Sequence, residues 1–520
     1  INSVGIADTV YLRGAYQRTS YSMHQQGGII ASYAQRVSEQ LDITVGGEYR
    51  RWTANHPGHF TNMYGGTSAT RTYEFRVNPD SAATFSRRVY QGDMTTPGGV
   101  DVGSVFGWEM ANDPTYATQY RNYRGETPQY TLYAQANVKP IQDLTILGSL
   151  QYVWYSYKLT ENMPSESGVA QRELTPAQAT AAGISSEGKA ANGLFYMLGT
   201  NGNYYEFELV NATRSRGFLQ PKVGANYNIN ENINVFGNFA HVERFTDLSI
   251  YYNSGNLNPD AEDEKSNQYE FVLCCTSSTL QAKVNLYTMT WDNKAARIQD
   301  VSKAGQPGYD RNGFRSELIG SSRNQGIEFE FTASLDKYLP VAGFQLRGSY
   351  TYMDNTWTKV LDEVKVDPTG ARRPFNTSAY NAQGVRYTQY FDELENTPVA
   401  SQAQQMGSLG LSYSMDGYFI GLDMNHFSKF IALDGGTYFA IDGEFSADGR
   451  FFTPKWSDRL PATWVWDFQL GGRYEAFGVR GDIRFQIINL FDSEYLASSD
   501  RYGVLPGALR TFRFSMSAGI

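Results

Sequence analysis

Strict alternation of apolar and polar residues is the dominant pattern along the chain. Between Phe344 and Tyr352 every even position is apolar, aromatic or glycine and every odd position is polar, which is the period of a β-strand. The pattern recurs at 327–333, 464–474, 479–487 and 512–516. These runs approach the ~9 to 11 residues of a tilted membrane strand, whereas strands of soluble proteins average about 5 or 6. The pattern therefore favours strands that span a membrane.

The alternation predicts an all-β fold, a transmembrane antiparallel β-barrel with about sixteen strands in this chain. The strands are expected to start near residues 8, 26, 41, 129, 143, 215, 232, 265, 279, 324, 343, 405, 417, 462, 478 and 508. Short turns are expected near 37–40, 139–142, 229–232, 276–278, 336–342, 415–417 and 476–478. Long polar segments are expected near 53–128, 159–214, 293–323, 355–404 and 429–461. Short periplasmic turns and long extracellular loops are typical of outer-membrane barrels.

The composition supports strands rather than helices as the spanning elements. Tyr (37), Phe (30) and Gly (50) are abundant in the 520 residues, and charged residues make up only 19%. No stretch approaches the ~20 consecutive apolar residues of a spanning helix. Aromatic residues gather at strand ends, as in 152–157, where a barrel places its interfacial girdle. The net charge of -9 is spread along the chain and argues against nucleic acid as a partner.

Few residues stand out as candidates for ligand binding. His56 and His59 lie in a predicted loop of a chain with only five His, but without nearby Cys or carboxylates the pair predicts no metal site. Trp108, Tyr251 and Tyr252 are candidate stacking residues, although such groups also arise by chance in a Tyr-rich chain. The simpler interpretation of all five is an ordinary loop role.

No catalytic pattern is present, so neither an enzyme nor a cofactor is predicted. The chain has no G-x-S-x-G elbow, no P-loop and no H-E-x-x-H helix. Cys274 and Cys275 are adjacent in a predicted strand, where neighbours point to opposite faces and lie too close for a relaxed disulfide. Residues 175–183 predict a short loop helix, with Thr175 as its cap and Pro176 at its first position.

Several short motifs follow one another in a fixed order. They are Tyr33-Ala34-Gln35, Tyr133-Ala134-Gln135, Phe218-Leu219-Gln220-Pro221-Lys222, Leu257-Asn258-Pro259-Asp260 with Tyr269-Glu270, and Asn489-Leu490-Phe491-Asp492 with Tyr495, Pro506-Gly507 and Arg510. Each motif alone is weak, but together and in this order they resemble the hairpins of TonB-dependent receptors. These receptors lie in the outer membrane of Gram-negative bacteria.

The resemblance implies capture of a scarce ligand (a metal chelate, cofactor, glycan or peptide) and its import with energy transmitted by TonB. Such receptors have about 22 strands, an amino-terminal plug and a TonB-contacting box. With no plug and roughly six strands fewer, residues 1–520 are expected to form a single, partial outer-membrane barrel domain. The expected partners are outer-membrane lipid and lipopolysaccharide, the TonB complex through the missing amino-terminal part, and a surface lipoprotein.

Charged residues on the predicted strands are expected to face the lumen, where they meet the plug or ordered water. They are Glu328, Glu330, Arg347, Asp467, Arg473, Arg480, Asp482 and Arg484. Solvation of the barrel interior is a simpler interpretation of each than ligand binding.

Two alternatives stay open. A passive porin-like channel of about sixteen strands fits the strand number directly, but it needs a constriction loop folded inward. A soluble all-β glycan-binding module needs a second sheet to cover the apolar faces of the strands.

Overall fold

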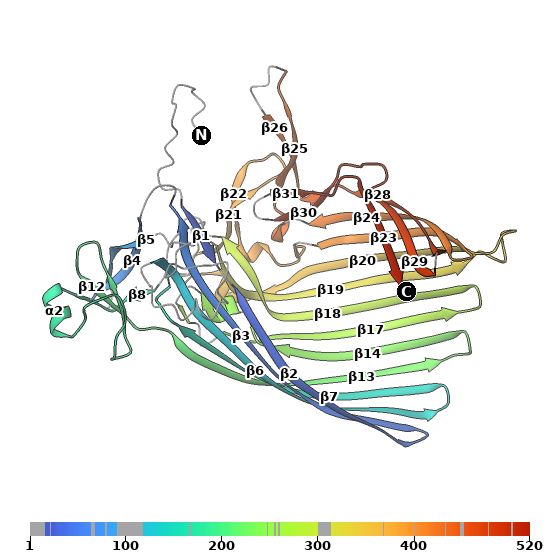
Figure 1. Cartoon of the computed structure of the whole chain (residues 1–520), viewed down its shortest axis with the longest axis horizontal. Helices are drawn as coiled ribbons and strands as arrows, with labels where there is room; N and C mark the ends of the chain where they lie inside the picture. The colour runs from blue at the N-terminus through green and yellow to red at the C-terminus, as the bar shows by residue number, and fades with distance from the viewer. Residues whose placement is uncertain are drawn as a thin grey trace.

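The structure is a computed structural model with one very large antiparallel sheet. It describes residues 16–20, 22–63, 68–78, 81–90, 118–165, 168–246, 248–253, 256–257, 261–299, 314–367, 369–400, 402–431, 433–447, 452–476, 478–500 and 503–519. Among these residues every helix is too short or too polar to cross a bilayer. Figure 1 shows the long strands side by side, with short turns at one end and long connections at the other. We call these the short-turn end and the long-loop end.

Fifteen long strands pair in chain order within the described residues. They are β2 (Met23–Ser38), β3 (Leu41–Asn62), β6 (Gln119–Ile141), β7 (Leu144–Glu161), β13 (Asn211–Asn228), β14 (Ile233–Arg244), β17 (Glu264–Thr276), β18 (Leu280–Gln299), β19 (Phe314–Ser334), β20 (Phe344–Val360), β23 (Gln402–Met415), β24 (Tyr418–Ile431), β28 (Thr463–Ala476), β29 (Val479–Ile488) and β32 (Thr511–Gly519). Each corresponds to a predicted strand, and the strand predicted near residue 8 lies outside the described residues. The predicted all-β meander is confirmed.

Two predicted strands begin earlier than expected. β6 starts at Gln119 rather than near 129, and β19 starts at Phe314 rather than near 324. The strands continue pairing beyond the stretch with alternating polarity, since Arg51 to His59 of β3 pair with Pro128 to Gln119 of β6. Parts of the predicted loops 53–128 and 293–323 are therefore strand.

The outward face of the sheet carries a continuous band of exposed apolar side chains. On β19, for example, Ile327 and Phe329 are 40% and 38% exposed. Toward the long-loop end the band finishes in an aromatic row formed by Tyr49, Tyr130 and Trp154. Their ring centroids are 4.9 Å and 5.5 Å apart from one strand to the next. An exposed apolar band bounded by aromatic side chains is the surface that a lipid-embedded barrel presents.

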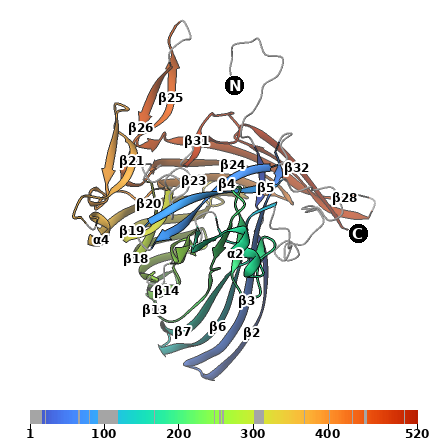
Figure 2. The same cartoon turned by 90° about the vertical axis from the view of Figure 1, so that its left-hand side faces the viewer.

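The sheet curls but has two free edges in the part of the chain that the structure describes. At one edge β1 (Gln17–Ser20) and β2 both pair with β3, and at the other edge β32 pairs with β29, with no pairing between β2 and β32. Nearly all residues of both strands are exposed. Figure 2 shows β2 at one end of the curled sheet, with β28 and β32 at the other.

A hydrogen-bonded turn fixes the path from β29 to β32, and it uses the last of the sequence motifs. Asn489 is 1% exposed and donates from Nδ2 to the carbonyl oxygens of Ser493 (2.9 Å) and Ala508 (3.0 Å). The backbone N–H of Arg510 donates to Asp492 Oδ1 at 2.7 Å. The motif thus supplies the side chains that satisfy the backbone of an irregular connection.

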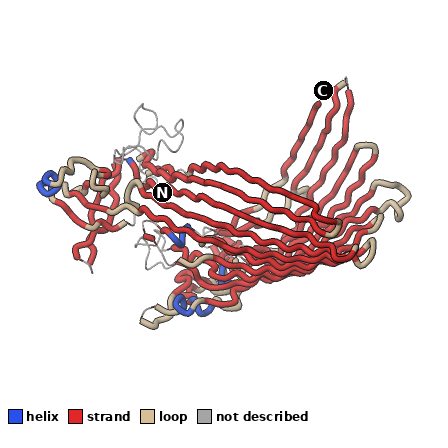
Figure 3. The backbone as a smooth tube through the Cα atoms, turned by 90° about the horizontal axis from the view of Figure 1, so that it is seen from below, coloured by secondary structure: helices blue, strands red, loops and turns tan. Residues whose placement is uncertain are grey.

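The first loop body is a small β-rich unit at the long-loop end. It contains β4 (Ser68–Asn78), β5 (Ser81–Tyr90), β8 (Val169–Ala170), β9 (Arg172–Leu174), α2 (Pro176–Ala181), β10 (Gly188–Lys189), β11 (Phe195–Leu198) and β12 (Tyr204–Phe207). Its core includes Tyr73, Phe85, Tyr205 and Phe207, and the rings of Phe85 and Tyr205 stack at 3.6 Å. Figure 3 shows the helical segments gathered toward this end of the sheet.

The predicted loop helix is confirmed. In α2 the Thr175 side chain accepts a hydrogen bond from the backbone N–H of Gln178, and the Gln178 side chain accepts one from the backbone N–H of Thr175. Pro176 occupies the first helical position, where no N–H is needed. Gly183, just past the helix, has a φ of +75°, which glycine adopts without strain.

The second loop body lies in the connection between β20 and β23 and packs against the connection between β24 and β28. It contains α4 (Asp362–Lys365), β21 (Pro374–Tyr380) and β22 (Arg386–Tyr390), packed around the fully buried Trp357. The neighbouring hairpin of β25 (Phe439–Phe445) and β26 (Phe452–Ser457) is held to it by a stack of Tyr380 on Trp456, with ring centroids 4.7 Å apart. The two connections are therefore locked together.

Candidate functional site

The eight charged residues predicted for the lumen all lie on the face opposite the exposed apolar band. On β19, Glu328 and Glu330 alternate with the exposed Ile327 and Phe329. The other six alternate with outward apolar residues in the same way, namely Arg347 on β20, Asp467 and Arg473 on β28, and Arg480, Asp482 and Arg484 on β29. We call this the inner face.

An ion pair on the inner face reaches across an intervening strand. Arg347 Nη2 on β20 lies 2.7 Å from Asp423 Oδ1 on β24, above Gly410 of β23. A Cβ at position 410 would lie 2.2 Å from Asp423 Oδ1, so glycine leaves the space that the pair needs. Asp423 lies opposite Asp467 on the next strand, and Asn425 donates to Asp467 Oδ2 at 3.2 Å. Hydrogen bonding and one arginine thus hold two carboxylates side by side.

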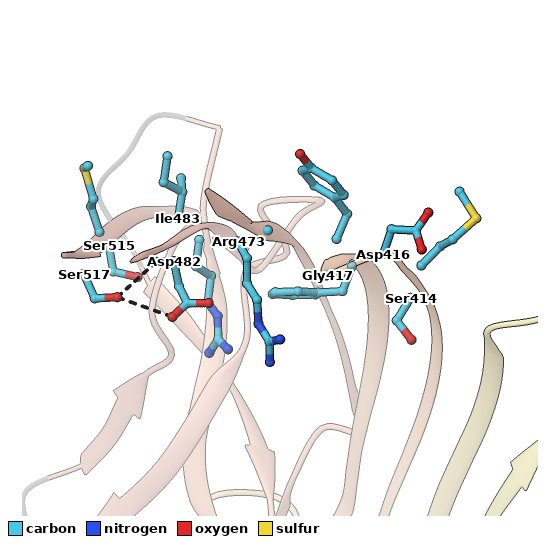
Figure 4. Close-up of a pocket in the computed structure, with 14 residues that line it drawn as sticks. Ser414, Asp416, Gly417, Arg473, Asp482, Ile483, Ser515 and Ser517 are labelled. Atoms are coloured by element: carbon cyan, nitrogen blue, oxygen red, sulfur yellow. Dashed lines mark hydrogen bonds between the residues drawn. The ribbon is translucent and has the colours of Figure 1, made fainter. Parts of the chain in front are cut away.

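A hollow of about 740 Å³ opens at the short-turn end between β24, β28, β29 and β32. Figure 4 shows Arg473 and Asp482 on one side of the strands and Ile483 on the other. The Ser517 hydroxyl and the Asp482 carboxylate are hydrogen-bonded at 3.5 Å. Within the described residues neither Arg473 nor Arg484 has a carboxylate at ion-pair distance, although the Arg484 guanidinium lies 5.3 Å from the Phe419 ring centre. The hollow is therefore lined by two cations and two carboxylates, since Asp416 and Asp482 also line it and Asp482 lies opposite Arg473 on the adjacent strand.

The structure brings two of the predicted ligand candidates into one stacking cluster near the long-loop end. The cluster comprises His24, Trp52, His56, Tyr123 and Tyr252. The imidazole of His56 stacks on Tyr123 at 4.6 Å, and Tyr123 lies 5.8 Å from Tyr252. His24 stacks on Trp52 at 5.0 Å and meets His56 edge-on at 5.8 Å. The members come from β2, β3, β6 and the connection after β14, so only folding assembles this surface.

Tyr251 and Tyr252 belong to a segment that folds over the inner face. This segment contains α3 (Leu248–Tyr251) and β15 (Tyr252–Asn253). The Tyr252 hydroxyl donates to Glu161 at the end of β7, and Leu159 packs against both tyrosines. α3 also contacts β19, which is not a neighbour of β7 in the sheet. A short helix that touches both strands must cross the inner side.

Arg214 fastens the same segment from β13. Its guanidinium lies 5.5 Å from the ring centre of Tyr251 and 5.4 Å from that of Phe245, and Nη2 is 3.2 Å from Asp263 Oδ1. Arg214 is only 7% exposed. The segment is thus held at two points, Arg214 and Glu161.

The remaining two candidates do not join the stacking cluster. His59 is completely buried, and its Nδ1 lies 3.0 Å from the Thr118 hydroxyl. Three residues apart on one strand, His56 and His59 point to opposite faces and form no pair. Trp108 lies outside the described residues. Among the residues that the structure describes, no three His, Cys, Asp or Glu side chains gather in a way that suits a metal ion.

Cys274 and Cys275 are free and occupy consecutive positions of β17, as predicted for ordinary strand residues. Cys275 follows the parity of the exposed Phe271 and Leu273, which places Cys274 on the inner face.

Acidification is expected to weaken the structure around His56. Burial lowers the pKa of His56 to about 4, and Arg121 and His24 add to this shift. The unfolded side chain titrates near pH 6.5, so the unfolded state takes up the proton first. Stability is therefore lost as the pH falls from about 6.5 to 4. Denaturant unfolding at pH 7.5 and 4.5 measures this loss, which should be smaller in His56→Gln. If the native protein and His56→Gln lost equal amounts of stability, His56 would not be the cause of the pH dependence.

Comparison with known proteins identifies the fold. A family model described as "TonB dependent receptor-like, beta-barrel" matches residues 3–490. The chain belongs to this family. A sequence search of the curated proteins finds no match.

Solved structures of TonB-dependent receptors share the fold. The copper transporter OprC matches with a TM-score of 0.56 at 12% identity, over 96% of this chain and 57% of that chain. The ferric citrate transporter FecA in the unliganded form matches with a TM-score of 0.51 at 14% identity, over 95% of this chain and 61% of that chain. The ferric-catecholate import receptor Fiu of E. coli K12 in its closed form matches with a TM-score of 0.50 at 16% identity, over 96% of this chain and 64% of that chain. The chain thus spans less than two thirds of each of these proteins.

This TonB-dependent receptor lies in the outer membrane of a Gram-negative bacterium, as predicted, and its family consists of transport receptors. The alternative of a soluble glycan-binding module is therefore wrong. In this family the long-loop end is extracellular and the short-turn end periplasmic. The stacking cluster accordingly lies at the extracellular part of the barrel wall.

Proposed function

We propose that the chain is the carboxy-terminal barrel of a longer receptor that imports a scarce extracellular ligand with energy transmitted by TonB. The edges of β2 and β32 pair with no further strand in the part of the chain that the structure describes. This supports a larger barrel, because unpaired strand edges within a membrane leave backbone groups unsatisfied. Arg473, Asp482 and Arg484 on the inner face supply charged groups for contacts with a plug inside that barrel. The TonB complex acts through this plug-bearing part, and the loop bodies offer a surface to a lipoprotein partner.

The stacking cluster is the observation that carries ligand binding. Aromatic and imidazole rings facing the interior offer flat faces, and Arg121, 5.6 Å from the Tyr123 ring centre, adds positive charge. Such a surface suits a ligand with conjugated rings and negative charge. A metal chelate with catecholate groups combines both properties, which agrees with the import of ferric catecholate by the receptor Fiu.

Uptake in cells tests this proposal. Cells that carry the complete gene should accumulate ⁵⁵Fe supplied as a catecholate complex, whereas cells lacking either the receptor or TonB should not. Tyr123→Ala should lower accumulation at limiting iron, because it removes the ring between His56 and Tyr252. Accumulation that persists without TonB would reject active import.

A passive channel is the second candidate, because α3 crosses the inner face as a constriction loop would. The same cells distinguish the two functions. A channel admits small sugars without TonB, and shortening the α3 segment would raise its single-channel conductance. A plugged receptor shows neither effect.

A further inference from the structure

Three cations gather on the lipid-side face directly beyond the aromatic row. Arg51 lies two residues past the row on β3, Lys158 four residues past it on β7, and Arg124 six residues past it on β6. Even spacing along a strand keeps side chains on one face, so all three share the outward face with the row. The side chains of Arg51 and Arg124 are 52% and 39% exposed, and Lys158 is exposed as well.

Only one carboxylate lies among these cations. Glu126 Oε2 is 2.7 Å from Arg51 Nη2, and its Oε1 is 3.0 Å from Arg124 Nε. Lys158 is the cross-strand neighbour of Glu126, and within the described residues its ammonium forms no ion pair. We call these four residues the basic cluster. It carries two more positive than negative charges on a chain whose net charge is -9.

Another sector of the outward face carries more negative than positive charge at a similar level. There Lys265 on β17 faces Glu243 on β14 and Asp292 on β18, four residues beyond the exposed Tyr269. The excess of positive charge over β3, β6 and β7 is therefore not repeated in this second sector.

The height of the basic cluster matches the headgroup layer. A strand rises about 3.3 Å per residue and tilts by roughly 40°, so two to six residues place the cations about 5 to 15 Å beyond the apolar band. The outer leaflet of this membrane contains lipopolysaccharide, whose lipid anchor carries phosphate groups. Arginine pairs with phosphate through two parallel N–H donors, and lysine adds a point charge.

We propose that the basic cluster is a binding site for the phosphorylated glycolipid of the outer leaflet. Arg51 and Lys158 flank Glu126 from two strands, so a phosphate that approaches from the lipid side meets cations on both strands while the acyl chains lie along the aromatic row and the band below. This site faces the lipid and is independent of the ligand imported through the lumen.

Native mass spectrometry of the complete receptor tests the site, with bisphosphorylated lipid A as the probe. The triple variant Arg51→Gln/Arg124→Gln/Lys158→Gln should bind it about tenfold more weakly, because each cation near an anionic headgroup contributes several-fold. Glu126→Gln should bind it about threefold more tightly, because the competing carboxylate is gone. Lys265→Gln is the matched control and should bind like the native protein.

The lipid source is tested with two further probes. Enzymatically dephosphorylated lipid A should bind native protein and triple variant equally. Phosphatidylglycerol should show no dependence on the cluster. Unchanged binding of lipid A by the triple variant, loss of binding in Lys265→Gln, or equal dependence for phosphatidylglycerol would overturn the proposal. Heat-modifiable migration in gels confirms that each variant is a folded barrel, and Glu126→Gln keeps the proposal falsifiable should the triple variant not fold.

Discussion

Replacing Ala134 with arginine is expected to lower the free energy of unfolding of the membrane-embedded barrel by about 2 to 4 kcal/mol. Ala134 lies on the outward face of β6, between the exposed Val45 and Leu150 on the adjacent strands. All three belong to the apolar band, where an arginine must leave water for hydrocarbon. The native alanine loses almost no contacts on replacement, so the effect reports the environment alone. Urea titration of protein folded into phospholipid vesicles measures the change.

Gln135→Arg is the matched control at the same depth. Gln135 lies on the inner face between Thr44 and Ser149, where other charged residues already stand. Arginine at this position should change the free energy of unfolding by less than about 1 kcal/mol, because a lumen-facing cation stays hydrated. Equal destabilisation by the two substitutions would show that the outward face of β6 does not meet lipid.

Arg87→Met is expected to destabilise the first loop body by about 3 kcal/mol. Arg87 is fully buried, and its Nε and Nη2 donate to the two carboxylate oxygens of Glu187 at 2.7 Å and 3.0 Å. Burial alone would lower the pKa of Arg87, but the Glu187 carboxylate raises it above the ordinary value and keeps the guanidinium charged. Methionine would leave Glu187 without its cation. Faster amide hydrogen exchange in β5 and β11 would report the loss.

Two further variants separate the buried pair from ordinary surface charge. Adding Glu187→Gln to Arg87→Met should restore part of the protection, because no unpaired charge remains and the amide still accepts from the backbone N–H of Leu198. Arg172→Gln breaks an ion pair of the same length, 2.7 Å to Glu206, but the Arg172 side chain is 58% exposed. Its cost should stay below about 1 kcal/mol. If Arg172→Gln proved as costly as Arg87→Met, burial would not be the cause.

The alternating pattern predicted most of the sheet because one face of each strand lies in apolar surroundings and the other face in polar surroundings. The pattern no longer predicts a strand where the two faces have the same surroundings. Residues 119–128 of β6 are polar on both faces apart from Tyr120, Tyr123, Gly125 and Pro128, so the period of two disappears while the strand pairing with β3 continues. The loop bodies were missed for another reason. Their strands are short and depend on contacts between segments far apart in the chain, as between Phe85 and Tyr205.

The candidate site could be predicted only in fragments. His56 stood out because histidine is scarce in the chain, and Tyr252 because it follows another Tyr. The ring that lies between them, Tyr123, is one of 37 tyrosines, and nothing in the sequence around it indicates a role in binding. The pairing of β3 with β6 brings His56 and Tyr123 together. Likewise, nothing local to Arg51, Glu126 or Lys158 indicates a common surface, because it exists only in the register of three strands.

The long pairing of β3 with β6 beyond the aromatic row has a consequence for how such a receptor diversifies. His56 and Tyr123 stand on a continuous hydrogen-bonded ladder rather than on loops of variable length. Strand-borne side chains hold their positions when neighbouring loops change. If the stacking cluster binds the ligand as proposed, selectivity can shift through single exchanges on a constant frame, while insertions in the loop bodies change only the outer surface.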